Sequence, residues 1–80
     1  MPMEKKNGNE NVLLSPLPGM VTSILVNKGD RVYRGQDLVV IESMKMECGV
    51  SSPCDGVVEE VIATAGKSVE SDDVLITFET

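Results

Sequence analysis

The sequence contains the stretch SPLPGMVTSILVNKGDRVYRGQDLVVIE at residues 15–42 and, 37 positions further on, the stretch SPCDGVVEEVIATAGKSVESDDVLITFE at residues 52–79. The two stretches align without a gap and share eight identical positions in 28. Glycine and proline impose special backbone angles, so their identities in phase mark matching turns: Pro16 with Pro53, Gly19 with Gly56 and Gly29 with Gly66. The sequence thus predicts two similar halves related by a quasi-twofold rotation.

The apolar composition indicates strands rather than helices. The chain has 12 Val, six Leu and four Ile, but only two Ala, one Phe, one Tyr and no Trp. Branched side chains fit a pleated, half-buried surface better than a helix. Eighty residues are also too few for two hydrophobic cores. We therefore expect one all-β domain.

Each half is expected to contain two longer strands separated by a glycine turn and a short strand. The longer strands are expected at residues 20–26, 38–43, 57–63 and 74–79, and the short ones around Val32 and Val69. Each half would leave one apolar face uncovered. The two faces would then pack together as a flattened barrel or sandwich.

Charge excludes some partners. The net charge is −6, with thirteen acidic residues, seven basic residues and no histidine. Nucleic acids and anionic membranes attract clustered Lys and Arg, so neither is an expected partner. A zinc site needs about four ligands, which two cysteines without histidine cannot supply. We also find no candidate catalytic triad, so no catalytic residue is expected and a stand-alone enzyme is disfavoured.

The first eleven residues, MPMEKKNGNEN, belong to neither copy of the repeat. They are too polar to bury anything, so we expect a disordered tail at 1–11 and a folded domain at 12–80. This segment has no apolar core of the kind found in secretory signals, and no apolar run approaches the roughly twenty residues that span a bilayer. We therefore expect a cytoplasmic protein without membrane insertion, monomeric as an isolated domain.

The joint between the two halves is a candidate hairpin with Met44 and Lys45 at its tip. Two-residue turns favour Asn-Gly or Asp-Gly, so Met-Lys breaks a local rule there, and such places are often functional. Met44 and Met46 could equally be adaptable core filler. Lys45 is the only basic residue between Gly35 and Gly66. It is either a solvated surface charge or an amine that a partner can single out.

The run Glu42-Ser43-Met44-Lys45-Met46-Glu47 resembles the attachment motif of biotinyl domains, in which a Met-Lys-Met triplet holds the biotinylated lysine. Further matching pieces lie on both sides of it: 15–19 with Val21, Gly29-Asp30 with Val32, Gly35 and Leu38, and 52–53 with 55–57. The resemblance covers about residues 12–79. It implies a flattened barrel-sandwich of two four-stranded antiparallel sheets. It also implies covalent biotin on Lys45, flanked by Met44 and Met46.

The resemblance further implies a carboxyl carrier that serves a biotin-dependent carboxylase, decarboxylase or transcarboxylase. Its partners would be a biotin protein ligase, a biotin carboxylase and a carboxyltransferase or decarboxylase. Gly35 and Glu42 take positions that help the modifying enzyme recognise the hairpin in related domains. Two departures stand out: Ser43 replaces the more usual Ala, and Gly49 replaces a larger residue and could loosen or bulge the outgoing strand.

Two alternatives stay open beside the biotin carrier. A lipoyl carrier of a 2-oxo acid dehydrogenase or glycine cleavage system shares the fold, although lipoyl sites usually read Asp-Lys-Ala around the lysine. An unmodified structural or interaction domain built from a repeat is the third possibility. In either carrier the activated acyl group must come from a partner enzyme, because the chain offers no base beside the lysine.

Overall fold

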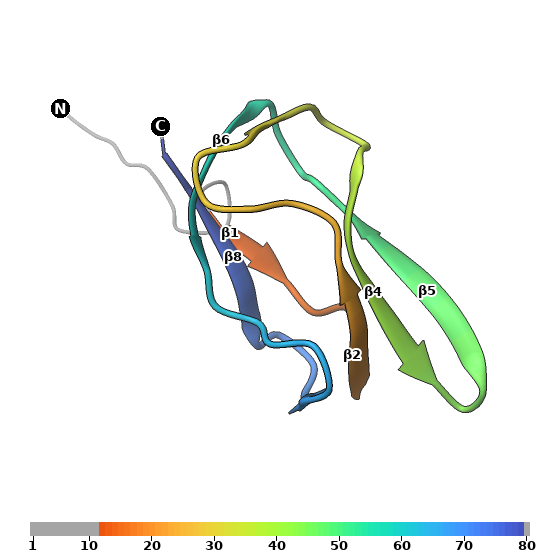
Figure 1. Ribbon diagram of the computed structural model, residues 1–80. Coiled ribbons are helices and arrows are strands. Elements are labelled where there is room, and N and C mark those ends of the chain that lie inside the picture. Colours follow the sequence, from red (N-terminus) through yellow and green to blue (C-terminus); the bar gives the residue numbers. More distant parts are fainter. Residues whose placement is uncertain (1–11, 80) are drawn as a thin grey trace, which may run out of the picture.

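The computed structural model describes residues 12–79, and this part of the chain consists of strands and turns without a helix (Figure 1). The strands are β1 (Val12–Leu14), β2 (Gly19–Ile24), β3 (Arg31–Val32), β4 (Asp37–Ser43), β5 (Met46–Ser51), β6 (Gly56–Val61), β7 (Ser68–Val69) and β8 (Val74–Glu79). They form two four-stranded antiparallel sheets, in the orders β1-β8-β6-β3 and β5-β4-β2-β7. The predicted all-β barrel-sandwich is therefore confirmed. The expected tail at 1–11 lies outside the described residues.

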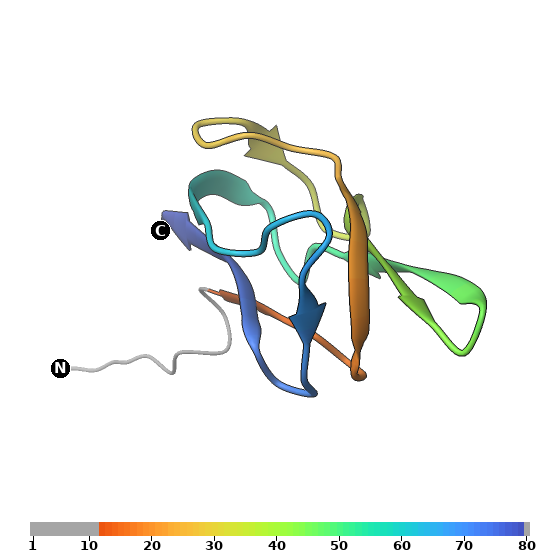
Figure 2. The same cartoon turned by 60° about the horizontal axis from the view of Figure 1, so that its bottom comes forward.

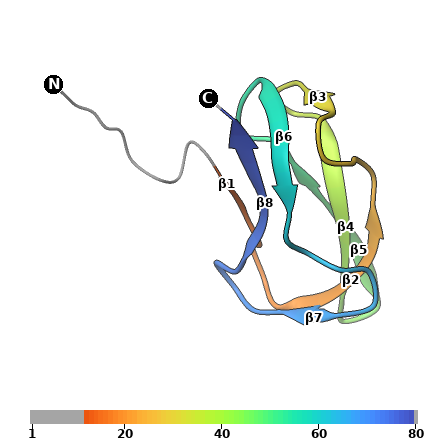
Figure 3. The same ribbon diagram turned by 60° about the vertical axis from the view of Figure 1, so that its left-hand side comes forward.

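The two halves are interleaved rather than simply stacked. The short strand β3 of the first half pairs with β6 of the second, and β7 of the second half pairs with β2 of the first. Figure 3 shows these two short strands at opposite ends of the molecule, each at an edge of a sheet. Each sheet consequently contains strands from both halves, so neither half can form its sheet without the other.

Backbone hydrogen bonds follow the 37-residue repeat. The Gly29 N–H donates to the Val58 oxygen at 2.8 Å, and at the matching positions the Gly66 N–H donates to the Val21 oxygen at 2.7 Å. Both glycines have φ of 91°, a value that L side chains rarely adopt. The register shifts in the ladders also match, after Val21 in β2 and after Val58 in β6. The quasi-twofold symmetry predicted from the sequence is thus present in the backbone.

The core lies between the sheets and draws on both halves. Many of its fully buried side chains occupy matching positions of the repeat, including Val21 with Val58, Leu38 with Leu75 and Val39 with Ile76. Pairs of this kind point to the same side of their sheets, since side chains alternate along a strand. The repeat therefore builds one shared core.

Several strand boundaries and one whole strand differ from expectation, and β2, β4 and β6 each begin one residue earlier than expected. β2 and β6 end two residues earlier than expected, at Ile24 and Val61. β1 was not anticipated as a strand, although it pairs with β8 through Val12 and Thr77. Its three apolar residues precede the aligned repeat, so the alignment did not include them. Within the described residues no helix is long and apolar enough to cross a membrane.

Candidate functional site

The candidate site is the tip of the β4–β5 hairpin, which projects beyond the body of the two sheets (Figure 2). Ser43 pairs with Met46 and Glu42 with Glu47, which leaves Met44 and Lys45 as the two residues of the turn. This is the position expected from the sequence. A tight two-residue connection fixes the position of the lysine on the end of a rigid ladder.

The turn forces an unusual backbone conformation on both of its residues. Met44 has φ of 53° and Lys45 has φ of 68°, and neither is glycine. Two-residue hairpin turns of this kind require positive φ at both central positions, which explains their preference for Asn-Gly. The left-handed conformation costs roughly 1–2 kcal/mol for each ordinary L residue. The turn is therefore strained, because Met44 and Lys45 occupy positions at which asparagine and glycine would be favoured.

The side chains at the tip are open to solvent. Met44 is 92% exposed and Met46 is 72% exposed, and Lys45 is exposed as well. The interpretation of the two methionines as core filler is therefore wrong: a hairpin that extends past the sheets gives them no core to enter. An amine presented in this way can be approached by a large modifying enzyme.

Two carboxylates lie just behind the tip. Glu42 on β4 and Glu47 on β5 are directly opposite each other, and both are exposed. Like charges in directly opposed positions destabilise an antiparallel pair. The lysine thus stands at the end of a strand pair whose surface is acidic. Glu42, predicted as a recognition residue, is brought close to the tip.

Strand β2 supports the base of the hairpin. Met20 pairs with Glu42 on one side and with Ser68 of β7 on the other. The neighbouring Gly19 packs so closely that an added Cβ would lie 2.6 Å from the Glu42 oxygen and 2.7 Å from Ile41 Cγ2. This close contact holds β2 against the last residues of β4. The exposed tip therefore stands on a tightly packed base.

Gly35 is not near the tip. It lies in the turn that precedes β4, with φ of 87°, and its N–H donates to the Ser52 oxygen at 2.9 Å beyond the far end of β5. The seven residues of β4 separate this turn from the tip, a distance of about 24 Å in an extended strand. The structure thus brings together Lys45, Met44, Met46 and Glu42, and leaves Gly35 at the other end of the hairpin.

Sequence reasoning missed three residues around the tip. Gly19 and Met20 come from a segment 25 or more positions earlier in the chain, and Glu47 was seen only as part of the motif. The sequence did contain a sign that Met20 is unusual. Its repeat partner is Val57, so a methionine takes the place of a branched side chain in a strand. Met20 is 45% exposed.

The site has no metal cluster. Residues 12–79 contain no group of three or more His, Cys, Asp or Glu side chains arranged to hold a metal ion. Lys45 contributes an exposed primary amine at the tip of the hairpin. Such a group can form an amide with an activated acyl group supplied by a partner.

Comparison with known proteins gives one matching family model, described as "Biotin-requiring enzyme", over residues 11–78. The methylcrotonoyl-CoA carboxylase subunit alpha, mitochondrial, of Oryza sativa subsp. japonica is 42% identical over 74 residues, covering 92% of this chain and 10% of the relative. The mitochondrial pyruvate carboxylase of Mus musculus is 42% identical over 65 residues, covering 81% of this chain and 6% of the relative.

A solved structure of a single-chain, multi-domain long-chain acyl-CoA carboxylase also matches. Its TM-score is 0.81 at 31% identity, and the match covers 98% of this chain and 8% of that structure. The chain thus spans a tenth or less of the length of each of these three proteins.

Proposed function

This chain belongs to the biotin-requiring enzyme family, as a biotin carboxyl carrier domain, and we propose that biotin is attached to this domain through an amide bond at Lys45 Nζ. The observation that supports Lys45 is its exposure on a two-residue turn between two exposed methionines. Lys28 and Lys67 are also exposed but lie outside the hairpin. The relatives are carboxylases, which favours biotin over a lipoyl group.

The tip suits an amine that reacts with an activated acyl group held by another protein. The Nζ atom attacks the activated biotinyl carbonyl, the activating group leaves, and the amine proton passes to a base on the modifying enzyme. A biotin protein ligase is the proposed source of that activated group and base. Met44 and Met46 would supply adaptable apolar contacts on either side of the lysine, and Glu42 a charged contact behind it.

The bound biotin supplies one chemical function, the reversible carriage of a carboxyl group. The chain contributes position: the hairpin holds the attachment point clear of the sheets, and the long side chain lets the group reach two active sites in turn. Tethering raises the local concentration of the carried group at each site, typically into the millimolar range. We propose a biotin carboxylase and a carboxyltransferase or decarboxylase as the two partners.

The acceptor of the carboxyl group is not specified by the carrier. Its relatives include proteins named for methylcrotonoyl-CoA and for pyruvate, so carriers of this family serve different acceptors. Specificity for the acceptor would therefore belong to the partner. We further propose a cytoplasmic location and a monomeric isolated domain of residues 12–80.

Replacing Lys45 tests the attachment site. Wild-type chain incubated with a biotin protein ligase, biotin and ATP should gain one biotinoyl mass increment, and its net charge should change from −6 to −7. Lys45→Ala should lose streptavidin labelling to background, with the melting temperature unchanged because the side chain is exposed. Lys28→Ala and Lys67→Ala are the matched controls and should label fully. Undiminished labelling of Lys45→Ala would contradict the assignment.

A further inference from the structure

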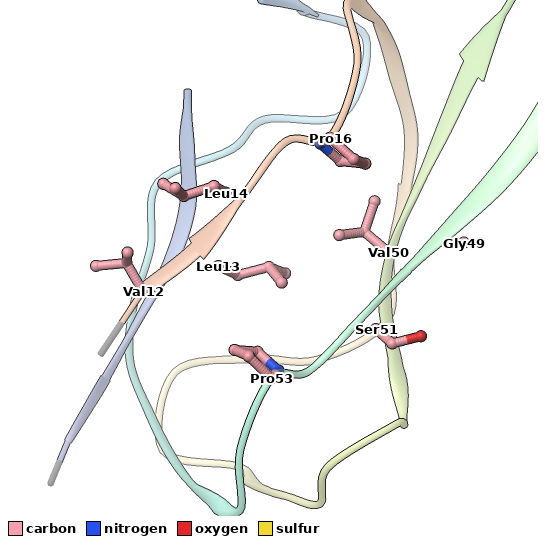
Figure 4. Close-up of a pocket in the computed structure, with 8 residues that line it drawn as sticks. All are labelled: Val12, Leu13, Leu14, Pro16, Gly49, Val50, Ser51 and Pro53. Atoms are coloured by element: carbon pink, nitrogen blue, oxygen red, sulfur yellow. The ribbon is translucent and has the colours of Figure 1, made fainter. Parts of the chain in front are cut away.

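A pocket lies between the edge strands of the two sheets, β1 and β5, and has a volume of about 470 Å³ (Figure 4). Its lining consists of four pairs related by the 37-residue repeat: Val12 with Gly49, Leu13 with Val50, Leu14 with Ser51 and Pro16 with Pro53. Both members of each pair line the same space, so the quasi-twofold axis passes through the pocket. Pockets that hold small molecules have volumes of about 300–1,000 Å³.

The pocket is apolar inside and has strand edges at its sides. Figure 4 shows the side chains of Leu13 and Val50 facing each other across it, with Pro16 and Pro53 at opposite ends. Among the described strands, β1 pairs only with β8 and β5 only with β4. The outer edges of both strands therefore present backbone donors and acceptors beside the apolar walls. This combination suits a compact apolar group that carries an amide or urea.

Gly49 makes the pocket asymmetric, because its repeat partner is the larger Val12. An added Cβ at Gly49 would lie 2.7 Å from Asp37 Oδ2 and 2.8 Å from Asp37 Cγ. Asp37 is held in place by the Ser51 hydroxyl, which donates to its Oδ1 at 3.0 Å. The Asp37 carboxylate therefore fills the space that a side chain at Gly49 would take. Gly49 lines the pocket with its backbone, on the strand that leads to the hairpin tip.

The attachment point is within reach of the β5 side of the pocket. Lys45 and Gly49 are four residues apart at the start of β5, a distance of about 14 Å along a strand. The lysine side chain, its amide and the biotin pentanoyl chain join Lys45 Cα to the biotin rings through about eleven bonds, which extend to about 13 Å. At full extension this arm ends at Gly49, and the ring system beyond it extends toward Val50.

We propose that biotin carried on Lys45 folds back along β5 and docks its ring system in the β1–β5 pocket. The inference rests on the proposed attachment at Lys45. Leu13 and Val50 are only 3% and 6% exposed and would form the floor of the docking site. The thioether ring and pentanoyl chain would lie on that floor between the exposed Pro16 and Pro53, and the urea would pair with the strand edge. Because a tether of this kind gives a local concentration on the order of millimolar, a weak intrinsic affinity is enough. The docked ring is withheld from partners, so the carrier alternates between a docked and an extended form.

The test compares apo and biotinylated forms of the same chain by ¹⁵N and ¹³C NMR, with intact mass measured on each sample. Docking should shift the amide signals of Gly49, Val50 and Ser51 on biotinylation. It should also give nuclear Overhauser contacts between biotin ring protons and the methyl groups of Leu13 and Val50. Val12→Glu places a charge in the pocket wall and should abolish these contacts. Val74→Glu, the same change on a strand residue outside the pocket, should retain them.

The two proposals fail in distinguishable ways. A sample with one biotinoyl increment on Lys45, and with shifts confined to residues 43–47, would overturn docking and leave the attachment intact. A sample in which the increment maps to another lysine would overturn both. Ring contacts that persist in Val12→Glu as strongly as in Val74→Glu would show that the ring lies elsewhere, which also overturns the proposed pocket.

Discussion

Lys45 is exposed on a turn that holds its backbone in the left-handed conformation, which is unfavourable for residues other than glycine. The turn is limited to two residues by the pairs Ser43–Met46 and Glu42–Glu47, and that length demands positive φ at Met44 and Lys45. Strain of this kind persists where the surrounding structure over-determines it, and it gathers at functional positions. A two-residue turn leaves no room for a mobile loop, so the Lys45 backbone keeps a fixed position relative to the ladder while its side chain can move.

The strain at Met44 can be measured by relieving it. Met44→Asn should raise the free energy of unfolding by about 1 kcal/mol, because asparagine tolerates the left-handed region and the 92% exposed methionine loses no burial. For a domain of this size that gain corresponds to a rise in melting temperature of about 4–8 °C.

Met46→Asn is the control for Met44→Asn. It makes the same change at an exposed strand residue that has no positive φ, so it should give no gain and a small loss, since asparagine is depleted in strands. Thermal unfolding followed by circular dichroism compares the two variants. Equal effects of the two substitutions would contradict the assignment of strain to the turn.

At the scale of elements, the β4–β5 hairpin depends on β2 for its support. The repeat places Gly19 and Gly56 at the starts of β2 and β6, yet their surroundings differ. An added Cβ at Gly19 would lie 2.6 Å from a backbone oxygen, whereas at Gly56 the nearest atom is the Glu79 oxygen at 3.5 Å. The half that carries the hairpin therefore packs its glycine more closely than its counterpart does.

This difference predicts unequal costs for the same substitution. Gly19→Ala should lower the free energy of unfolding by roughly 1–3 kcal/mol, because the backbone of Glu42 or the Ile41 side chain must move. Gly56→Ala should change it by less than about 0.5 kcal/mol. Urea unfolding of both variants gives the comparison. A loss at Gly56 as large as the loss at Gly19 would show that the close contact is not the cause.

Gly49 illustrates how one element shapes another. The sequence suggested that this glycine loosens β5 or marks a bulge. The ladder is regular at Gly49, which pairs with Val40, and the register shift occurs farther along, between Asp37 and Val39. The glycine instead leaves room for the Asp37 carboxylate that crosses from β4. Glycine at position 49 is therefore explained by the space that the Asp37 carboxylate needs, rather than by a need for a flexible strand.

At the scale of the whole molecule, the interleaved halves share one core. Strands β3 and β7 each complete the sheet of the opposite half, so a fluctuation that opens one half also removes pairing from the other. Figures 1 and 3 place the hairpin tip away from the described end of β8. The lysine is thus presented at one end of a single cooperative unit.

Symmetry of the core predicts matched losses from matched substitutions. Leu38 and Leu75 are repeat partners in different sheets, and both are fully buried. Leu38→Ala and Leu75→Ala should each lower the free energy of unfolding by roughly 2–5 kcal/mol, and the two losses should agree within about 1 kcal/mol. Because the chain has no Trp, chemical denaturation of the two variants is followed by circular dichroism rather than by fluorescence. A difference beyond that range would show that the core does not follow the repeat.

The sequence by itself determined the fold class, the repeat and the hairpin tip, because each of these depends on local backbone preferences. Glycine and proline act through their own backbone angles, so their 37-residue phase reveals matching turns without knowledge of tertiary contacts. The break in turn chemistry at Met44-Lys45 is equally local, and the structure shows positive φ at both residues. These features can be read because each depends on residues close together in the chain.

Tertiary structure alone decided which distant residues meet. The exchange of β3 and β7 between the halves, the support of the hairpin by Gly19 and the distance of Gly35 from the tip all depend on pairings between distant segments. The same holds for the pocket, whose walls come from β1 and β5 and include a strand that the sequence did not reveal. Which strand edges face each other is set by how the two sheets close over one core. The pattern of residues along the chain does not indicate which strand edges will face each other.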